Sequence, residues 1–168
     1  MVPYYGRHGT KQFIRRKPIR WGYKLWTGTN KHGYIEWFQP YQGSSTMVSP
    51  KYKSFGCGGN EVLHFTDVLQ EQFGDLYFDN FFTSMSLLDE LRSRNIKGTG
   101  TIRENRVKKE CNLLHSKEIK KKERGFFDHS KREDDGMIIC KWNDNSVVTV
   151  ALNNYPVLPT LQVQQKSE

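Results

Sequence analysis

Acidic residues are missing from the first 35 positions of this 168-residue chain. Eight of its 26 lysines and arginines lie in that stretch, and the rest of the chain holds 18 basic and 18 acidic residues. The whole net charge of +8 therefore lies near the N-terminus. A basic block of this kind suits a polyanion, with nucleic acid first among the candidates, and the alternative is a solvated strand edge. The densest cluster in the block is Arg15, Arg16 and Lys17.

Long hydrophobic runs are also missing. No stretch of about 18 apolar residues exists, which excludes a membrane-spanning helix, and the N-terminus lacks the apolar core of a secretory signal. Cysteine is scarce as well. Cys57, Cys111 and Cys140 are far apart and form no CxxC pair, which indicates reduced intracellular thiols rather than a disulfide framework or a zinc site.

Common catalytic signatures do not occur in the chain. The sequence contains no GxGxxG, GxxxxGK[ST], GxSxG or HExxH motif, and its five histidines lack metal-ligand spacing. The glycine-rich stretch FGCGGN at 55–60 is a weak candidate for an anion-binding loop, and a tight turn is the simpler interpretation.

Periodic patterns predict an α/β fold for the first two thirds of the chain. Residues 20–26 and 33–43 alternate like strands, and the turn at 30–33 joins them as a hairpin. A helix is predicted from Asn60 to a stop at Gly74.

A short apolar strand is then predicted to end at Asp79. Thr83 or Ser84 caps the next helix, which buries its leucines, and residues 96–105 form another strand with small side chains on one face. The order β-β-α-β-α-β indicates a mixed sheet.

The last third has a different character. A charged helix is predicted over 107–124, a polar loop over 128–136 and a hairpin over 137–152, whereas the tail lacks periodicity.

Asp79 is the residue with the clearest chemical interest, because it stands among four aromatic residues in YFDNFFTS. A carboxylate at the end of a buried strand is where α/β sheets place functional groups, and it can hold a hard cation such as Mg²⁺. Phosphoryl-transfer enzymes use pairs of such ions. From the residues alone, a simple helix-capping role for Asp79 or Asn80 is the favoured alternative.

Six segments, taken in order, closely resemble the piggyBac transposase family, especially the piggyBac transposable element-derived proteins of animal genomes. The resemblance extends to about Asn153, and its most specific part combines DNFFTS with GTGTIRENR. The segments are MVPYYGR, KPIRWGYKLW, GYIEWFQPYQG, YFDNFFTS, LLDELRSRNIKGTGTIRENR and KWNDNSVVTVALN.

The resemblance implies a catalytic core with an RNase H-like mixed sheet, interrupted by a β-containing insertion domain. Family members cut DNA at the ends of an element and join it into TTAA targets, using Mg²⁺ held by three aspartates. Asp79 matches the second of these, as a catalytic metal ligand. Arg103 and Arg106 fall in the matching TGTxRxNR segment and would contact DNA phosphate, unless they are ordinary surface arginines. The implied organisation is a partial core at 1–106, an insertion-domain-like segment at 107–153 and an extended tail at 154–168.

The resemblance also implies that the metal site is incomplete in the chain as given. The family's first aspartate would lie just upstream of Met1, and its third would follow the insertion domain. We therefore expect a DNA-binding, nuclear, transposase-derived fragment without transposition activity alone, with a homodimer or a related transposase as partner and no membrane association. Two alternatives remain: a part of an intact Mg²⁺-dependent transposase, and a domesticated protein-interaction module.

Overall fold

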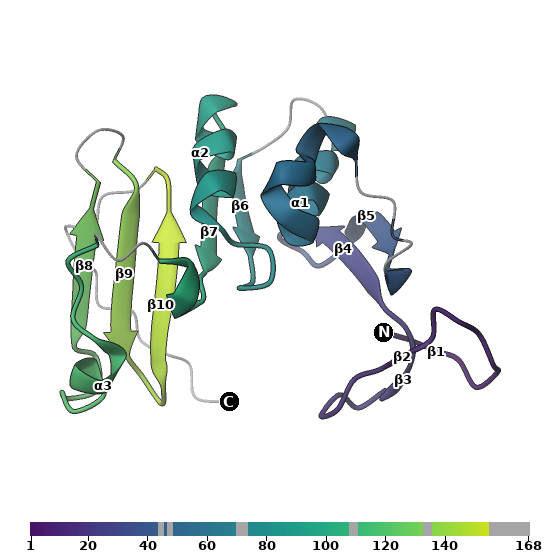
Figure 1. The fold of residues 1–168 in the computed structure, drawn as a ribbon, viewed down its shortest axis with the longest axis horizontal. Coiled ribbons are helices and arrows are strands. Elements are labelled where there is room, and N and C mark those ends of the chain that lie inside the picture. The colour runs from purple at the N-terminus through teal and green to yellow at the C-terminus, as the bar shows by residue number, and fades with distance from the viewer. Residues whose placement is uncertain (44–45, 47–48, 70–73, 108–110, 133–135, 155–168) are drawn as a thin grey trace. The chain divides into compact units, whose positions relative to one another are not determined.

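The computed structural model describes residues 1–43, 46, 49–69, 74–107, 111–132 and 136–154 (Figure 1). The chain divides into two compact units, Met1–Pro50 and Lys51–Glu168. Within the described residues, no helix is long and apolar enough to cross a bilayer.

The first unit consists of two small antiparallel sheets. One has the strand order β1-β3-β2, and the other is the hairpin of β4 and β5. The strands are β1 (Val2–Pro3), β2 (Gln12–Phe13), β3 (Trp21–Tyr23), β4 (Leu25–Thr29) and β5 (Ile35–Pro40).

The predicted hairpin is confirmed for β4 and β5. Its turn forms because the side-chain Oδ1 of Asn30 accepts hydrogen bonds from the backbone N–H groups of His32 and Tyr34. The single strand predicted over 20–26 is two strands in the structure. β3 pairs with β1 and β2, and only β4 pairs with β5. A Cβ at Gly22 would lie 2.0 Å from the carbonyl oxygen of Val2, so only glycine allows this close strand approach.

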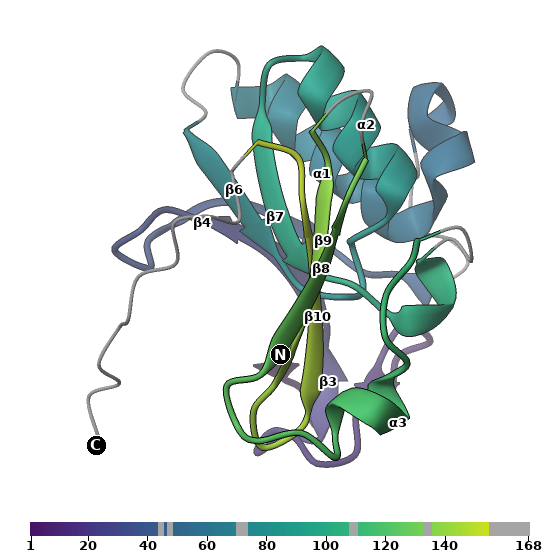
Figure 2. The same cartoon turned by 90° about the vertical axis from the view of Figure 1, so that its left-hand side faces the viewer.

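The second unit is a five-stranded mixed sheet with helices, and it confirms the predicted α/β class (Figures 1 and 2). The strand order is β6-β7-β10-β9-β8, in which β6 and β7 are parallel and the other neighbours antiparallel. In chain order its elements are η2 (Pro50–Phe55), α1 (Gly56–Leu69), β6 (Asp75–Phe78), α2 (Met85–Ser93), β7 (Lys97–Thr101), η3 (Glu104–Arg106), α3 (Ser116–Ile119), β8 (Phe127–Lys131), β9 (Ile138–Asn143) and β10 (Val147–Leu152).

The core of this unit lies where α2 packs on β6 and β7. Leu87, Leu88 and Leu91 are fully buried, as their helical spacing predicted. The small residues of β7 make room for them, since a Cβ at Gly98 would lie 3.0 Å from the Leu91 side chain. Ser84 caps α2 by accepting a hydrogen bond from the backbone N–H of Leu87, which confirms one of the two predicted caps.

The glycine-rich stretch at 55–60 is not the loop that was predicted. Helix α1 already begins at Gly56, four residues before Asn60. The glycines serve close packing instead: a Cβ at Gly58 would lie 2.6 Å from the carbonyl oxygen of Phe81, and one at Gly59 would lie 2.9 Å from Phe55. The predicted helix end at 70–73 lies outside the described residues.

Two predictions for the last third were wrong. Of the described residues in 107–124, only Ser116–Ile119 are α-helical, and residues 128–131 belong to strand β8 rather than to a polar loop. β8 pairs with β9, which supplies its backbone partners despite its polar sequence. The hairpin of β9 and β10 was predicted correctly. The tail from residue 155 onward lies outside the described residues.

The sheet continues across the domain boundary that was predicted after Arg106. β10 pairs with β7, so strands from both sides of that position share one sheet. An ion pair between side chains also joins the two sides of this predicted boundary. The Nζ of Lys141, a side chain only 5% exposed, lies 2.9 Å from Oε1 of Glu104, and the hydrogen bonds from Lys141 and Ser116 lower the pKa of Glu104.

Strand β6 lies at the end of the sheet and presents an aromatic edge. Within the described residues it pairs only with β7, and Tyr77 is 72% exposed. An open edge strand is a template for association, and the only charged residue of β6 is Asp75 at its start, so the chain is expected to aggregate at high concentration. Tyr77→Lys should raise the concentration at which turbidity appears. Tyr34→Lys is the matched control, because Tyr34 is equally exposed but lies outside β6. Equal effects of both changes, or a soluble wild-type monomer with a cooperative thermal transition, would contradict this account.

Candidate functional site

Asp79 stands directly after β6, at the carboxyl end of the parallel strand pair. Its side chain is exposed, and its Oδ1 accepts a hydrogen bond of 2.7 Å from the backbone N–H of Phe81. Its carbonyl oxygen accepts hydrogen bonds from the N–H groups of Phe82 and Thr83 and from the Thr83 hydroxyl. These four bonds define a tight turn that sets the direction of the carboxylate.

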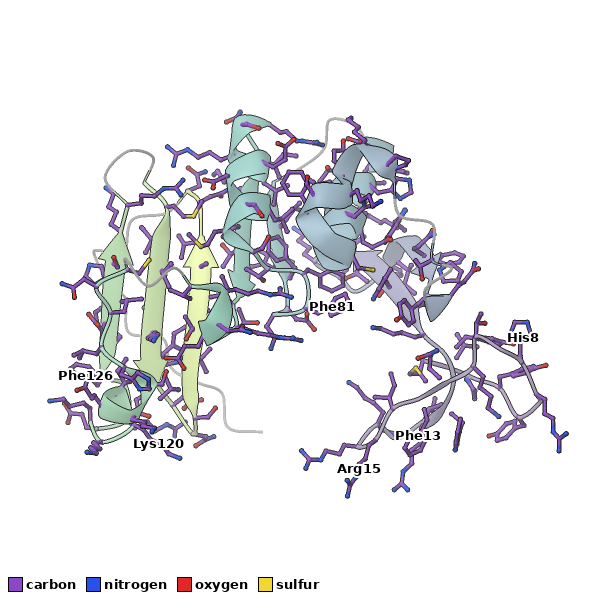
Figure 3. The ribbon with its side chains drawn as sticks, in the orientation of Figure 1. His8, Phe13, Arg15, Phe81, Lys120 and Phe126 are labelled. Carbon is purple, nitrogen blue, oxygen red and sulfur yellow. The ribbon has the colours of Figure 1, made fainter. Side chains whose placement is uncertain are left out.

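Arg106 holds the same turn from the other side. Its Nη1 donates to the carbonyl oxygens of Asn80 at 3.1 Å, Phe81 at 3.1 Å and Thr83 at 2.6 Å. Three carbonyls around one guanidinium nitrogen form a charge-assisted clamp on residues 80–83. Phe81, labelled in Figure 3, marks the position of this turn.

Arg103 has a looser attachment to the turn. It is exposed, and its Nε donates one long hydrogen bond of 3.3 Å to Oδ1 of Asn80. The structure therefore brings the two predicted arginines to the Asp79 turn, with one held firmly and the other largely in solvent.

A divalent cation needs several oxygen ligands, and the described residues supply too few here. Among them no group of three or more His, Cys, Asp or Glu side chains could hold a metal. Asp79 offers one exposed carboxylate, whereas Mg²⁺ takes six ligands in near-octahedral geometry. These residues by themselves do not fit a two-metal centre.

The basic cluster at 15–17 lies in the first unit. Arg15, Arg16 and Lys17 are all exposed in the loop that joins β2 to β3. The loop is closed at its base by a hydrogen bond from the Ile14 N–H to the Arg20 carbonyl, and Arg16 has a positive φ of 74°. One short loop therefore carries three exposed cationic side chains, of which Arg15 is labelled in Figure 3.

Comparison with known proteins shows which family the chain belongs to. A family model described as "Transposase IS4" matches residues 1–168. Human "PiggyBac transposable element-derived protein 3" is 47% identical over 171 residues, which cover 100% of this chain. This chain belongs to the piggyBac transposase family. Human "PiggyBac transposable element-derived protein 2" is 43% identical over 163 residues and covers 95% of the chain.

The fold of the family is shared as well. A cryo-EM structure described as a "piggyBac transposase synaptic complex with hairpin DNA" matches 95% of this chain with a TM-score of 0.70 and 19% identity. The chain spans 28% and 27% of the two human piggyBac-derived relatives and 32% of the matched transposase chain.

Sequence reasoning missed one ionisable residue in this piggyBac-family chain. Glu61 lies within α1, is 2% exposed, and its Oε2 has no hydrogen-bond partner among the described residues. Burial raises the pKa of Glu61 to about 7. The sequence signal that could have predicted this burial is the position of Glu61 beside Val62 and Leu63 on a mostly apolar helix.

Proposed function

We propose that the chain is a piggyBac transposase-derived, DNA-binding protein whose first contact with DNA is the loop carrying Arg15, Arg16 and Lys17. The exposure of three cations on one closed loop, in a stretch without acidic residues, is the observation that supports it. Phosphate contacts by such side chains provide sequence-independent affinity.

Arg103 and Arg106 are proposed as further phosphate contacts in the second unit. Arg103 is exposed, and Arg106 uses Nη1 for the turn, which leaves its other nitrogens to reach a phosphate. A DNA backbone beside these arginines would also lie beside Asp79. In this proposal Asp79 is one of three catalytic Mg²⁺ ligands of the family, and the chain alone performs no transposition. Its proposed location is the nucleus, where its DNA partner is found, and its proposed protein partner is a second copy or a related transposase.

Charge reversal tests the DNA contact. The triple change Arg15→Glu, Arg16→Glu and Lys17→Glu is expected to weaken binding to a labelled DNA duplex by at least about tenfold at moderate salt. The control reverses Lys120, Lys121 and Lys122, which are exposed in the second unit and give the same change in net charge; Lys120 is labelled in Figure 3. Fluorescence anisotropy measures both. If the two triple variants lose affinity equally, only the net charge matters and the loop is not the contact.

A second candidate function is supported by the length of the relatives. The chain spans 28% of a human piggyBac-derived protein, so the same residues have a counterpart within a much longer polypeptide. In such a polypeptide Asp79 would work with carboxylates from outside this segment, and the complete site would be Mg²⁺-dependent. Intact mass of the endogenous protein, captured with an antibody against residues 111–132, separates the two candidates.

A further inference from the structure

One face of the sheet β1-β3-β2 is covered by aromatic side chains. Phe13 of β2 and Trp21 of β3 lie directly opposite each other, with ring centroids 4.8 Å apart. Tyr23 follows Trp21 on the same face because strand side chains alternate. Tyr4 and His8 contact the ring of Tyr23, at centroid distances of 4.9 and 5.5 Å. These five residues, Tyr4, His8, Phe13, Trp21 and Tyr23, form the aromatic face.

This face is open to solvent rather than packed as a core. Phe13 is 52% exposed, Trp21 is 53% exposed and Tyr4 is 36% exposed. Exposing large rings is unfavourable, since burying one contributes about 1.5–3 kcal/mol. An exposed patch of this kind marks a binding surface.

The charges around the face indicate what it binds. The Nζ of Lys11 lies 5.1 Å from the ring centroid of Trp21, a cation–π distance. The basic loop of Arg15, Arg16 and Lys17 leaves the end of the same two strands, and no acidic residue precedes Glu36 (Figure 3). A neutral or basic protein surface would gain no electrostatic attraction from these basic residues. A polyanion that also carries flat rings matches both the positive charge and the exposed aromatic side chains.

We propose that the aromatic face binds unpaired nucleotides of a single-stranded nucleic acid. Bases would stack on Trp21 and Phe13 while Lys11 and the basic loop contact the phosphates, the combination that single-strand-binding surfaces use. Paired bases within a duplex are already stacked on each other and offer only their edges. This inference rests on the proposed DNA-binding function and adds to it a preference for unpaired bases at one defined surface.

Substitutions at Trp21 separate stacking from apolar packing. In the full chain, Trp21→Leu keeps an apolar side chain but removes the ring, whereas Trp21→Phe keeps a smaller ring. Binding to a labelled oligothymidylate of about 20 nucleotides is expected to weaken roughly tenfold or more with leucine, because one stacked base is lost, and much less with phenylalanine. Tyr34→Leu is the control, since Tyr34 is 72% exposed in the same unit but lies outside this sheet.

The outcomes distinguish this inference from the function on which it rests. The inference predicts that Trp21→Leu weakens oligothymidylate binding more than binding to a duplex of equal length. If Trp21→Leu leaves both affinities unchanged while the charge reversal at 15–17 abolishes them, DNA binding stands and the stacking surface is rejected. If wild type binds neither probe, the proposed function itself fails. Self-association that Trp21→Leu abolishes, without any effect on oligothymidylate binding, would assign the face to a second copy and overturn the proposal.

Discussion

Arg106→Ala is expected to destabilise the folded chain by about 2–4 kcal/mol, one of the largest effects of any single change at its surface. The substitution removes three hydrogen bonds to the carbonyls of Asn80, Phe81 and Thr83 and frees the turn that carries Asp79. Urea unfolding at low protein concentration measures the loss. Hydrogen exchange should speed up most at the amides of Phe81, Phe82 and Thr83, because these donate to Asp79 in the same turn.

Arg103→Ala is the matched control for this change. It removes the same charge three residues away but only one long hydrogen bond, so its effect on stability should stay within about 0.5 kcal/mol. The clamp is rejected if Arg106→Ala leaves the unfolding midpoint and these exchange rates unchanged while DNA binding weakens. Arg106 would then act only through phosphate.

Glu61→Gln is expected to stabilise the chain, and to do so only above acidic pH. Burial raises the pKa of Glu61 from 4.5 to about 7 in the folded state, so the native chain binds more protons than the unfolded chain between these values. Wild-type stability therefore falls as the pH rises from about 4.5 to about 7 and stays reduced above that. Glutamine removes this loss, which is roughly 3 kcal/mol at full ionisation.

Urea unfolding at about pH 4.5 and about pH 8 tests this expectation. The gain from Glu61→Gln should be large at the higher pH and close to zero at the lower one. Glu123→Gln is the control, because Glu123 is exposed and lies in the same unit. A pH-independent gain, or an equal gain in the control, would mean that the ionised Glu61 is not penalised by burial.

Local patterns were sufficient to predict much of the fold. The leucine spacing of α2, its serine cap and the two hairpins are short-range features, and the structure confirms each of them. Helix α1 begins earlier than predicted, and its Gly58 packs closely against the Phe81 backbone, a contact between distant parts of the chain that no local pattern encodes. Strand β8 was not predicted because its side chains are mostly polar. The strand is stabilised by its pairing with β9, which the local sequence does not reveal.

The sequence predicted some residues of the candidate site better than others. Asp79 was identified from its place after an apolar strand, although no residue of β6 is buried in the structure. The simpler alternative, a helix cap at Asp79 or Asn80, was wrong, because Ser84 caps α2 and the hydrogen bond that Asp79 accepts from Phe81 closes a turn before it. The clamp by Arg106 depends on two segments more than 20 residues apart, so only a three-dimensional structure exposes it. The basic cluster was evident from composition, but its projection on a closed loop was not.

The salt dependence of duplex binding tests the central claim most directly. If Arg15, Arg16 and Lys17 each neutralise a phosphate, they should contribute roughly −3 to the slope of the logarithm of the association constant against the logarithm of the salt concentration. The charge-reversed triple variant should lose this contribution and keep only the smaller slope from contacts such as Arg103 and Arg106. An affinity that does not change between about 50 and 200 mM salt, or no measurable binding by the wild-type chain, would contradict DNA binding through the basic loop.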